Sequence, residues 1–261
     1  MPPSEIRKEA REALRGKWGK AICVILAYFL ITYALSVIGE LVNYLSTFVA
    51  AFFEGFMKAG TISYIILNIA YNIIVTVPIS LGLIISFMKL KRGERVKIFG
   101  FLEDGVANFK KSLGIWAHTL FKLLLPIACL IAIMVLMSIL FIVGSNSIII
   151  TLLSVALYVA SIVYIISRSL LYALAYYIGY DRPELSSKDC VKKSEDLMKG
   201  NRGNCFLLEL SFIGWALLGV LTFGIGYLWL MPYMQIAMVC FYDRLAKPEV
   251  KKIDEEGKIE E

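Results

Sequence analysis

Several residue types and motifs are missing from this sequence, and each absence excludes a class of function. The chain has one histidine, His118, and five scattered cysteines without a CxxC motif, so a cysteine and histidine zinc site has no ligand set. A Ser-His-Asp site would have only His118 available, and neither HExxH nor GxSxG occurs. The GxxxxGK[ST] spacing of a phosphate loop is also missing. We therefore expect a non-enzymatic protein with no catalytic residues, no metal and no cofactor.

Charged residues are scarce as well. They make up 18% of the 261 residues, whereas 59% are hydrophobic, and the mean hydropathy is +0.72. A water-soluble protein of this size needs a more highly charged surface. Several apolar runs exceed the ~20 residues that a helix needs to cross a bilayer. The composition predicts an all-α, polytopic membrane protein.

The apolar run Cys205–Tyr242 cannot cross a bilayer as one straight helix. Its length as a helix would be about 57 Å, nearly twice the hydrocarbon core. We therefore expect it to fold back at Gly224-Ile225-Gly226. Basic residues flank both of its ends, so the positive-inside rule places both ends in the cytoplasm.

The net charge of +6 follows the same rule along the whole chain. All of the 27 lysines and arginines except Lys58, Lys122 and Arg168 fall in four blocks between or beyond the apolar runs. The blocks are Arg7–Lys20, Lys89–Lys111, Arg182–Arg202 and Arg244–Lys258. This pattern predicts a multi-pass protein of the cell membrane with both termini in the cytoplasm, and it explains the basic charge without nucleic acid. The expected partners are anionic lipid headgroups at the cytoplasmic face and a second membrane protein.

Read in order, the chain predicts six transmembrane helices arranged as three hairpins in a single domain, residues 1–247. Each hairpin follows an amphipathic helix on the cytoplasmic surface, which gives three units at about 4–90, 97–178 and 187–243. The charged segment 248–261 lacks a hydrophobic face and is expected to be a disordered tail. Residues 40–60 are expected to form an external loop with one interfacial helix.

The surface helices have recognisable end signals. Ser4 and Ser187 are the expected N-caps of the first and third surface helices. Glycines are expected to end all three surface helices, because glycine is favoured just after the last helical residue. These glycines are Gly16, Gly114 and Gly200.

A polar stripe runs along the second predicted span. Asn68, Asn72, Thr76 and Ser80 recur at every fourth position, which keeps them on one face of a helix. Such a stripe faces protein or water rather than lipid. It serves either as polar contacts between packed helices or as the lining of a polar path. Pro78 and Gly82 predict a kink below it.

Four ionisable residues lie inside apolar runs and form the second candidate site: His118, Lys122, Arg168 and Glu209. A charge within the bilayer is costly, so Arg168 needs a partner, and Glu209 is the acid at similar depth. In one interpretation these two residues pair and Lys122 reaches the headgroups. In the other, the surplus of positive charge binds the headgroup of an anionic lipid or another anionic amphiphile.

A family resemblance rests on several short strings. They are Ser194–Asn201, Ser211–Trp215, Gly224-Ile225-Gly226, Trp229, Pro232-Tyr233, Phe241-Tyr242 and, near the N-terminus, Ala13–Trp18. On these strings the chain resembles an uncharacterised bacterial integral-membrane family, the domain of unknown function nine-seventy-five. The resemblance implies a multi-span topology. It implies no substrate, because the family has no established activity.

Two functions remain open from the sequence. The first is an accessory, scaffold or lipid-binding protein of the membrane. The alternative is a transporter or channel-like permease that uses the Asn68–Ser80 stripe as its path. No intramembrane acid lies beside that stripe to couple ion movement, which favours the first function.

Overall fold

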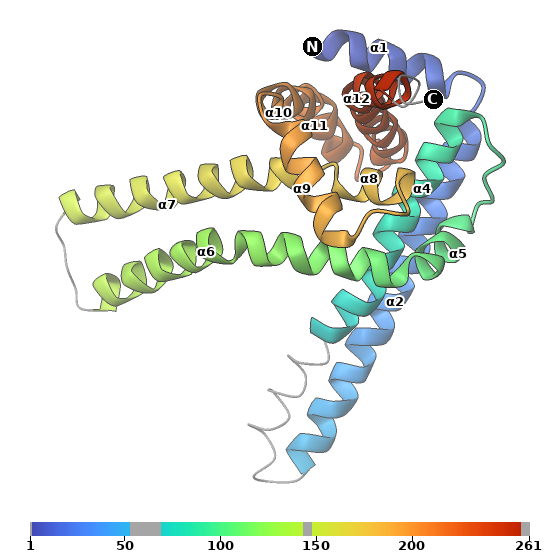
Figure 1. Ribbon diagram of the computed structural model, residues 1–261. Helices are drawn as coiled ribbons and strands as arrows, with labels where there is room; N and C mark the ends of the chain where they lie inside the picture. Colours follow the sequence, from blue (N-terminus) through green and yellow to red (C-terminus); the bar gives the residue numbers. More distant parts are fainter. Residues whose placement is uncertain (1, 53–68, 143–147, 257–261) are drawn as a thin grey trace. The chain divides into compact units, whose positions relative to one another are not determined.

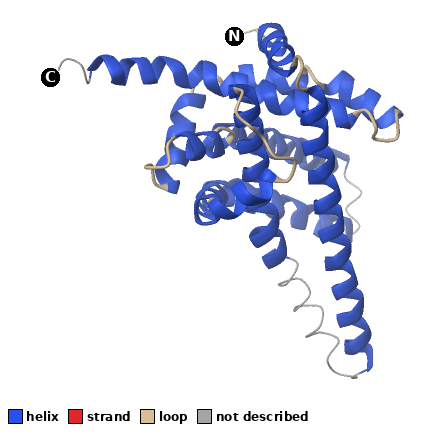
Figure 2. Ribbon diagram, turned by 90° about the vertical axis from the view of Figure 1, so that its right-hand side faces the viewer, coloured by secondary structure: helices blue, strands red, loops and turns tan. Residues whose placement is uncertain are grey.

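A computed structural model describes residues 2–52, 69–142 and 148–256 of the chain. Over these ranges the chain forms helices joined by turns and loops, with no strand (Figure 2). The predicted all-α class is confirmed. Five helices of the described part are long and apolar enough to cross a membrane, consistent with a multi-pass membrane protein. They are Trp18–Val42, Ile69–Arg92, Phe109–Ile139, Leu152–Asp181 and Arg202–Leu221.

The arrangement of six spans in three hairpins stays a prediction. The last long helix, α12 (Tyr227–Glu256), is not among the five candidates, because charged residues follow its apolar part. The described chain divides into two compact units, one of residues 1–113 with 207–261 and the other of residues 114–206.

The first unit is organised around α12. Figure 1 shows its helices: α1 (Pro3–Leu14), α2 (Trp18–Phe52), α4 (Val77–Arg92), α5 (Gly100–Ala107), α11 (Ile213–Leu221) and α12. Helix α12 packs against α1, α2, α4 and α11. One face of α1, formed by Ile6, Ala10 and Leu14, is fully buried, as are Ile236 and Phe241 of α12. The amphipathic N-terminal helix is thus part of a core.

Helices α4 and α5 approach so closely that only glycine fits between them. A Cβ added to Gly82 would overlap the backbone of Phe101, and one added to Gly105 would lie 2.6 Å from the carbonyl oxygen of Pro78. Backbone atoms cannot rotate away as a flexible side chain can. These two glycines therefore fix α5 against α4.

An ionic network ties α1 to α4 and α12 within the first unit. Lys91 lies 3.1 Å from Glu9 and 2.7 Å from Asp243, and Arg244 lies 2.9 Å from Glu9 and 3.0 Å from Glu5. Burial raises the pKa of Glu9, but the hydrogen bonds from Lys91 and Arg244 outweigh it, so this pKa lies below its ordinary value. The hydrogen bonds to Glu5 and Glu9 raise the pKa of Arg244.

The second unit contains most of α6 and four further elements. The elements are α6 (Phe109–Ile142), α7 (Ile148–Ser169), a 3₁₀ turn η2 (Leu170–Tyr172), α8 (Ala175–Asp181) and α9 (Ser187–Met198). Helix α9 packs on α8 and η2. Its buried Ser194 donates to the carbonyl of Leu171 at 2.8 Å and accepts from the amide of Leu174 at 3.2 Å. Val191 and Met198 are buried beside it, as their helical spacing predicts.

Two of the three predicted glycine stops are confirmed. Gly16 and Gly200 follow the last residues of α1 and α9 with left-handed φ angles of 74° and 80°. Gly114 is not a stop, because α5 ends at Ala107 and α6 starts at Phe109 and continues through Gly114.

Both predicted serine N-caps are wrong by one or two residues. Helix α1 begins at Pro3, ahead of Ser4, since proline is preorganised for the first helical position. Helix α9 is capped by Ser186 rather than Ser187, and the Ser186 hydroxyl accepts from the amide of Asp189 at 3.2 Å.

The turn predicted within Cys205–Tyr242 is confirmed. Residues 222–226 form a turn between α11 and α12, and Gly224 has a φ of 88°. The loop predicted for residues 40–60 is wrong over 40–52, since α2 remains helical to Phe52, and 53–60 lie outside the described residues. Helix α12 continues to Glu256, into the segment expected to be disordered.

Candidate functional site

The second unit brings the starts of α6 and α9 into close contact. A side chain at Gly114 would overlap that of Ser187, so the glycine lets the first residue of α9 lie against α6. One turn further along α6, His118 and Lys122 stand at i and i+4. The same spacing relates Lys188 and Lys192 on α9.

These two pairs line one groove of about 520 Å³, which we call the cationic groove. Four of its seven lining residues are basic, and no lining residue is acidic. The lining residues are Ala117, His118, Phe121, Lys122, Lys188, Val191 and Lys192. Positive charge therefore concentrates on both sides of an apolar floor.

One acid lies at the edge of the cationic groove. The carboxylate of Glu195 is 3.2 Å from the ammonium of Lys122, whose side chain is 47% exposed. The Lys122 charge is therefore partly neutralised. No ion pair of Lys188 or Lys192 is present among the described residues, which leaves their charges open to an anion.

The imidazole of His118 is oriented by its own helix. Its Nδ1 lies 2.8 Å from the carbonyl oxygen of Gly114. Since a carbonyl only accepts, this contact places a proton on Nδ1 and leaves Nε2 as the second nitrogen. In the imidazolium form Nε2 is a further donor to an anion in the groove.

The combination suits an anion that has an apolar part. Lysine ammonium groups bind phosphate as mobile point charges, each with three donors. Phe121, 75% exposed, and the buried Val191 supply apolar surface between the lysines. Among the described residues, no group of histidines, cysteines and acids in the groove or elsewhere is placed to hold a metal ion.

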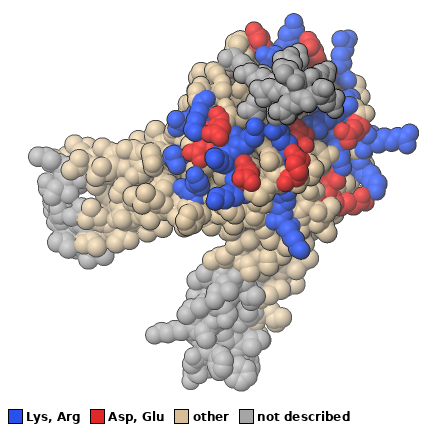
Figure 3. Space-filling model, viewed as in Figure 1, with Lys and Arg blue, Asp and Glu red and all other residues tan. Residues whose placement is uncertain are grey.

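The cationic groove lies at the start of a long stretch of sequence without charged residues. No lysine, arginine, aspartate or glutamate occurs between Lys122 and Arg168. On the face shown in Figure 3, the described lengths of α6 and α7 that extend away from α9 carry no charged side chain. Large apolar side chains along these two helices are exposed, among them Leu125 and Leu152. Such a surface needs a lipid or protein cover.

The structure joins two of the four predicted ionisable residues and adds two that the sequence analysis missed. Arg168 is not among the groove's lining residues, and its guanidinium donates to the hydroxyl of Tyr172 at 3.3 Å. Glu209 belongs to the first unit, so the predicted pair with Arg168 stays a prediction. The i, i+4 spacing of Lys188 and Lys192 on a predicted surface helix was the available signal.

The predicted polar stripe is described only in part. Asn68 lies outside the described residues, and for Asn72 only the backbone is described. Residues Asn72–Thr76 form a π-helical turn directly before α4, an irregularity that recurs at functional sites. Ser80 donates to the carbonyl of Thr76 at 2.8 Å. That bond satisfies the hydroxyl within its own helix.

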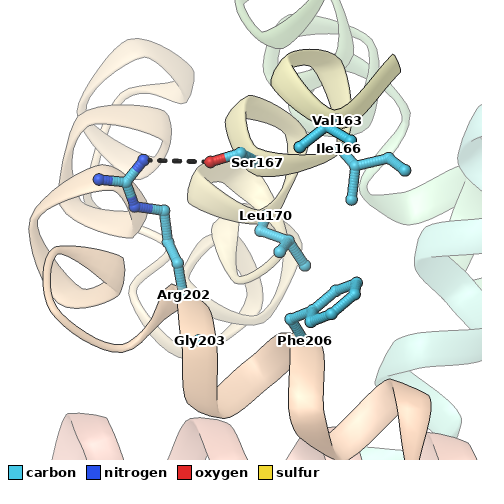
Figure 4. Close-up of a pocket in the computed structure, with 7 residues that line it drawn as sticks. All are labelled: Val163, Ile166, Ser167, Leu170, Arg202, Gly203 and Phe206. Atoms are coloured by element: carbon cyan, nitrogen blue, oxygen red, sulfur yellow. Dashed lines mark hydrogen bonds between the residues drawn. The ribbon is translucent and has the colours of Figure 1, made fainter. Parts of the chain in front are cut away.

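A smaller cavity of about 280 Å³ lies between α7 and the start of α10 (Arg202–Leu210) (Figure 4). Its lining is almost wholly apolar and is formed mainly by Val163, Ile166, Leu170 and Phe206. The guanidinium of Arg202 is directed to the hydroxyl of Ser167, at 3.5 Å. Arg202 and Ser167 are the polar side chains of this lining, and they contact each other, so the cavity offers little to orient a ligand.

Comparison with known proteins gives a family and no function. No curated protein and no solved structure matches the chain. The family described as "Protein of unknown function (DUF975)" matches residues 1–249. Because that match covers nearly all of the 261 residues, the chain belongs to this family of unknown function.

Proposed function

We propose that this protein is a non-enzymatic, multi-pass component of the cell membrane that binds anionic lipid through the cationic groove at the cytoplasmic face. The observation that carries the proposal is the position of the groove. His118, Lys122, Lys188 and Lys192 converge at the last charges before a long uncharged stretch. A membrane that covers the uncharged stretch has its headgroups at the level of these residues.

The expected strength follows from the two lysines without an ion pair. A lysine near an anionic membrane surface contributes about 1 kcal/mol, so Lys188 and Lys192 together correspond to a factor of about 30 in lipid preference. His118 and the partly neutralised Lys122 contribute less. Phe121 lies against the upper part of an acyl chain when a phosphate occupies the groove.

The test counts the lipids that stay bound. Protein is released from nanodiscs of equal phosphatidylglycerol and phosphatidylcholine, and native mass spectrometry measures the ratio of the two retained lipids. We expect phosphatidylglycerol to dominate for the native chain and the ratio to fall at least tenfold for Lys188→Gln with Lys192→Gln. The matched control, Lys8→Gln with Lys20→Gln, removes the same charge from residues outside the groove and leaves the ratio unchanged. Equal ratios for the native chain and the groove variant would overturn the proposal.

The alternative function, a permease, uses the polar stripe of the second span. It is favoured by the π-helical turn at Asn72–Thr76, while the internal hydrogen bond of Ser80 agrees with a structural role. Reconstitution into liposomes separates the two functions. A lipid-binding component gives no ion or solute flux above that of empty liposomes, whereas a permease gives flux that falls when Thr76 and Ser80 are replaced.

A further inference from the structure

The first unit holds a cavity of its own that no part of the proposed function uses. Its volume is about 550 Å³, within the range of sites for small organic ligands. The lining comes from α1, the start of α2, α11 and α12, and we call it the aromatic cavity. The lining residues are Ser4, Arg7, Arg11, Trp18, Trp215, Leu218, Gly219, Thr222, Gly226, Trp229, Leu230 and Tyr233.

The aromatic residues of this cavity differ in how far they are held by other protein groups. Tyr233 packs edge-on against Phe212 with ring centroids 5.0 Å apart, lies 6.4 Å from Trp18, and donates to the carbonyl of Arg7 at 3.2 Å. Trp215 and Trp229, by contrast, are 57% and 51% exposed. Two half-exposed indoles at one opening supply a large apolar contact area.

Close packing of α11 on the start of α12 shapes the floor. A Cβ at Gly226 would lie 2.9 Å from the Cα of Gly219, and one at Gly219 would lie 3.1 Å from the ring of Tyr227. Thr222 donates to Gly219 and accepts from Gly226, both at 2.9 Å, so its hydroxyl is already satisfied. The floor therefore offers shape rather than polar groups.

The polar groups come from one flank of α1. Arg7 and Arg11 stand at i and i+4 and line the cavity, and no carboxylate is among its lining residues. The Nε of Arg7 is buried without a hydrogen-bond partner among the described residues, and its Nη1 donates to Ser211 at 3.3 Å. A guanidinium has five N–H donors, and leaving a buried one unpaired is costly.

The charged residues on the opposite flank of α1 are paired with other residues of the protein. There Glu5 and Glu9 are paired with Arg244, and Glu9 also pairs with Lys91. The charges of one flank are thus matched by protein, whereas the arginines of the other face a cavity with aromatic sides. A carboxylate or phosphate would supply the missing acceptor, since arginine binds both in a bidentate manner.

We infer that the aromatic cavity binds an amphiphilic anion, a molecule whose carboxylate or phosphate meets Arg7 and Arg11 and whose apolar part lies among Trp18, Trp215 and Trp229. The site belongs to the first unit and is independent of the cationic groove. Its acceptor is held by arginines at one end of an apolar cavity, so it selects a ligand by its apolar body as well as by its charge.

Tryptophan fluorescence tests this directly, because three of the protein's four tryptophans line the cavity. A Trp116→Phe background removes the fourth. The probe is 11-bromoundecanoate, whose bromine quenches an indole in contact with it, and 11-bromoundecanol is the neutral comparison. We expect saturable quenching by the acid at a concentration at least tenfold lower than for the alcohol.

The variants assign that preference to the two arginines. Arg7→Gln with Arg11→Gln brings the acid to the level of the alcohol, and Arg7→Lys with Arg11→Lys retains part of the preference. Lys8→Gln with Arg15→Gln, an equal charge change on exposed residues outside the cavity, leaves it intact. Equal quenching of the native chain by acid and alcohol overturns the inference without reliance on any variant, as does a native affinity for the acid in the Arg7 and Arg11 glutamine variant.

The source of the anion is read from a competition in nanodiscs. If the ligand is a membrane lipid, phosphatidic acid in the bilayer reduces quenching by bromoundecanoate relative to phosphatidylcholine. If it is a soluble organic acid, both bilayers leave quenching unchanged. Each result supports the site and identifies where its ligand comes from.

Discussion

The cationic groove and the aromatic cavity have nearly the same volume, about 520 and 550 Å³, but they present charge in different ways. In the groove the charge belongs mainly to lysines on a helix surface beside one exposed phenylalanine. In the cavity it belongs to arginines beside three tryptophans and a tyrosine. Lysine attracts any nearby phosphate, whereas a guanidinium fork requires a defined geometry. The groove is thus suited to a headgroup of the bulk membrane, and the cavity to one kind of molecule.

The two units that contain these sites also differ in how their helices are covered. Within the 18-residue apolar segment of each candidate span, 56% of the residues are buried for Ile69–Arg92 and 22% for Trp18–Val42, compared with 6% for each of Phe109–Ile139 and Leu152–Asp181. The first unit has close glycine packing and an ionic network that joins three helices. In the second unit, the exposed lengths of α6 and α7 depend on what surrounds them. Substitutions in the first unit should therefore change stability, and those in the second should change lipid binding.

The largest loss of stability is expected from Gly82→Ala. Its new methyl group would overlap the backbone of Phe101, and the cost of overpacking between two helices is about 3 kcal/mol. The midpoint of SDS-induced unfolding in mixed micelles measures it. Gly19→Ala is the control, because a Cβ there meets nothing within 4 Å and alanine favours the helix. Equal midpoints for the two variants would contradict the close α4–α5 contact.

A smaller loss, about 2 kcal/mol, is expected from Lys91→Ala. The side chain of Lys91 is 13% exposed, and its removal leaves Glu9 and Asp243 without the ammonium between them. The same SDS titration measures the change. Lys97→Ala breaks the exposed pair with Glu103 in the same unit, and no measurable change is expected there. A Lys91 variant as stable as the native chain would show that the network does not hold α1.

Acid should weaken the same network by about 1 kcal/mol or less, since Glu9 is partly exposed. The pKa of Glu9 is lowered in the folded chain, so its contribution to stability is complete above the ordinary value of about 4.3. It is lost as the pH falls through the lower folded value. Unfolding midpoints between pH 6 and pH 3 should show this loss in the native chain and a smaller one in Glu9→Gln. Parallel curves would exclude Glu9 as its source.

The smallest expected effect sharpens the account of the cationic groove. Glu195→Gln frees the ammonium of Lys122 and should raise the ratio of retained anionic to zwitterionic lipid about twofold, as expected for a half-exposed ion pair. Native mass spectrometry of the variant measures the ratio. Glu103→Gln is the control, since Glu103 pairs with Lys97 in the first unit, outside the groove. A ratio that does not rise in the Glu195 variant would show that Lys122 takes no part in binding.

Local signals in the sequence predicted the helical class, the turn at Gly224 and the glycine stops at Gly16 and Gly200. Each depends on residues close together in the chain. The exact helix starts were missed because neighbouring Ser and Pro residues compete for the same cap position. Gly114 was misread as a stop for a related reason, since glycine also serves where two helices approach closely, and only the fold distinguishes the two uses.

The candidate sites, too, could be predicted only where they depend on residues close together in the chain. The pairing of His118 with Lys122 follows from i, i+4 spacing along one helix. The addition of Lys188 and Lys192 requires the contact between Gly114 and Ser187, two residues that are distant in the sequence. Likewise, Arg7 and Arg11 are predicted as surface charges, and only the fold shows that α11 and α12 place two tryptophans and Tyr233 beside them.

Photo-crosslinking at Phe121 tests the central claim most directly. With p-benzoylphenylalanine at this position in the otherwise unchanged chain, lipids in contact with the groove are crosslinked in nanodiscs of equal phosphatidylglycerol and phosphatidylcholine, and mass spectrometry identifies them. The same substitution at Leu136, further along α6, reports the composition of the surrounding bilayer. The account predicts several-fold enrichment of phosphatidylglycerol at Phe121 over Leu136. The same lipid composition at both positions would contradict it.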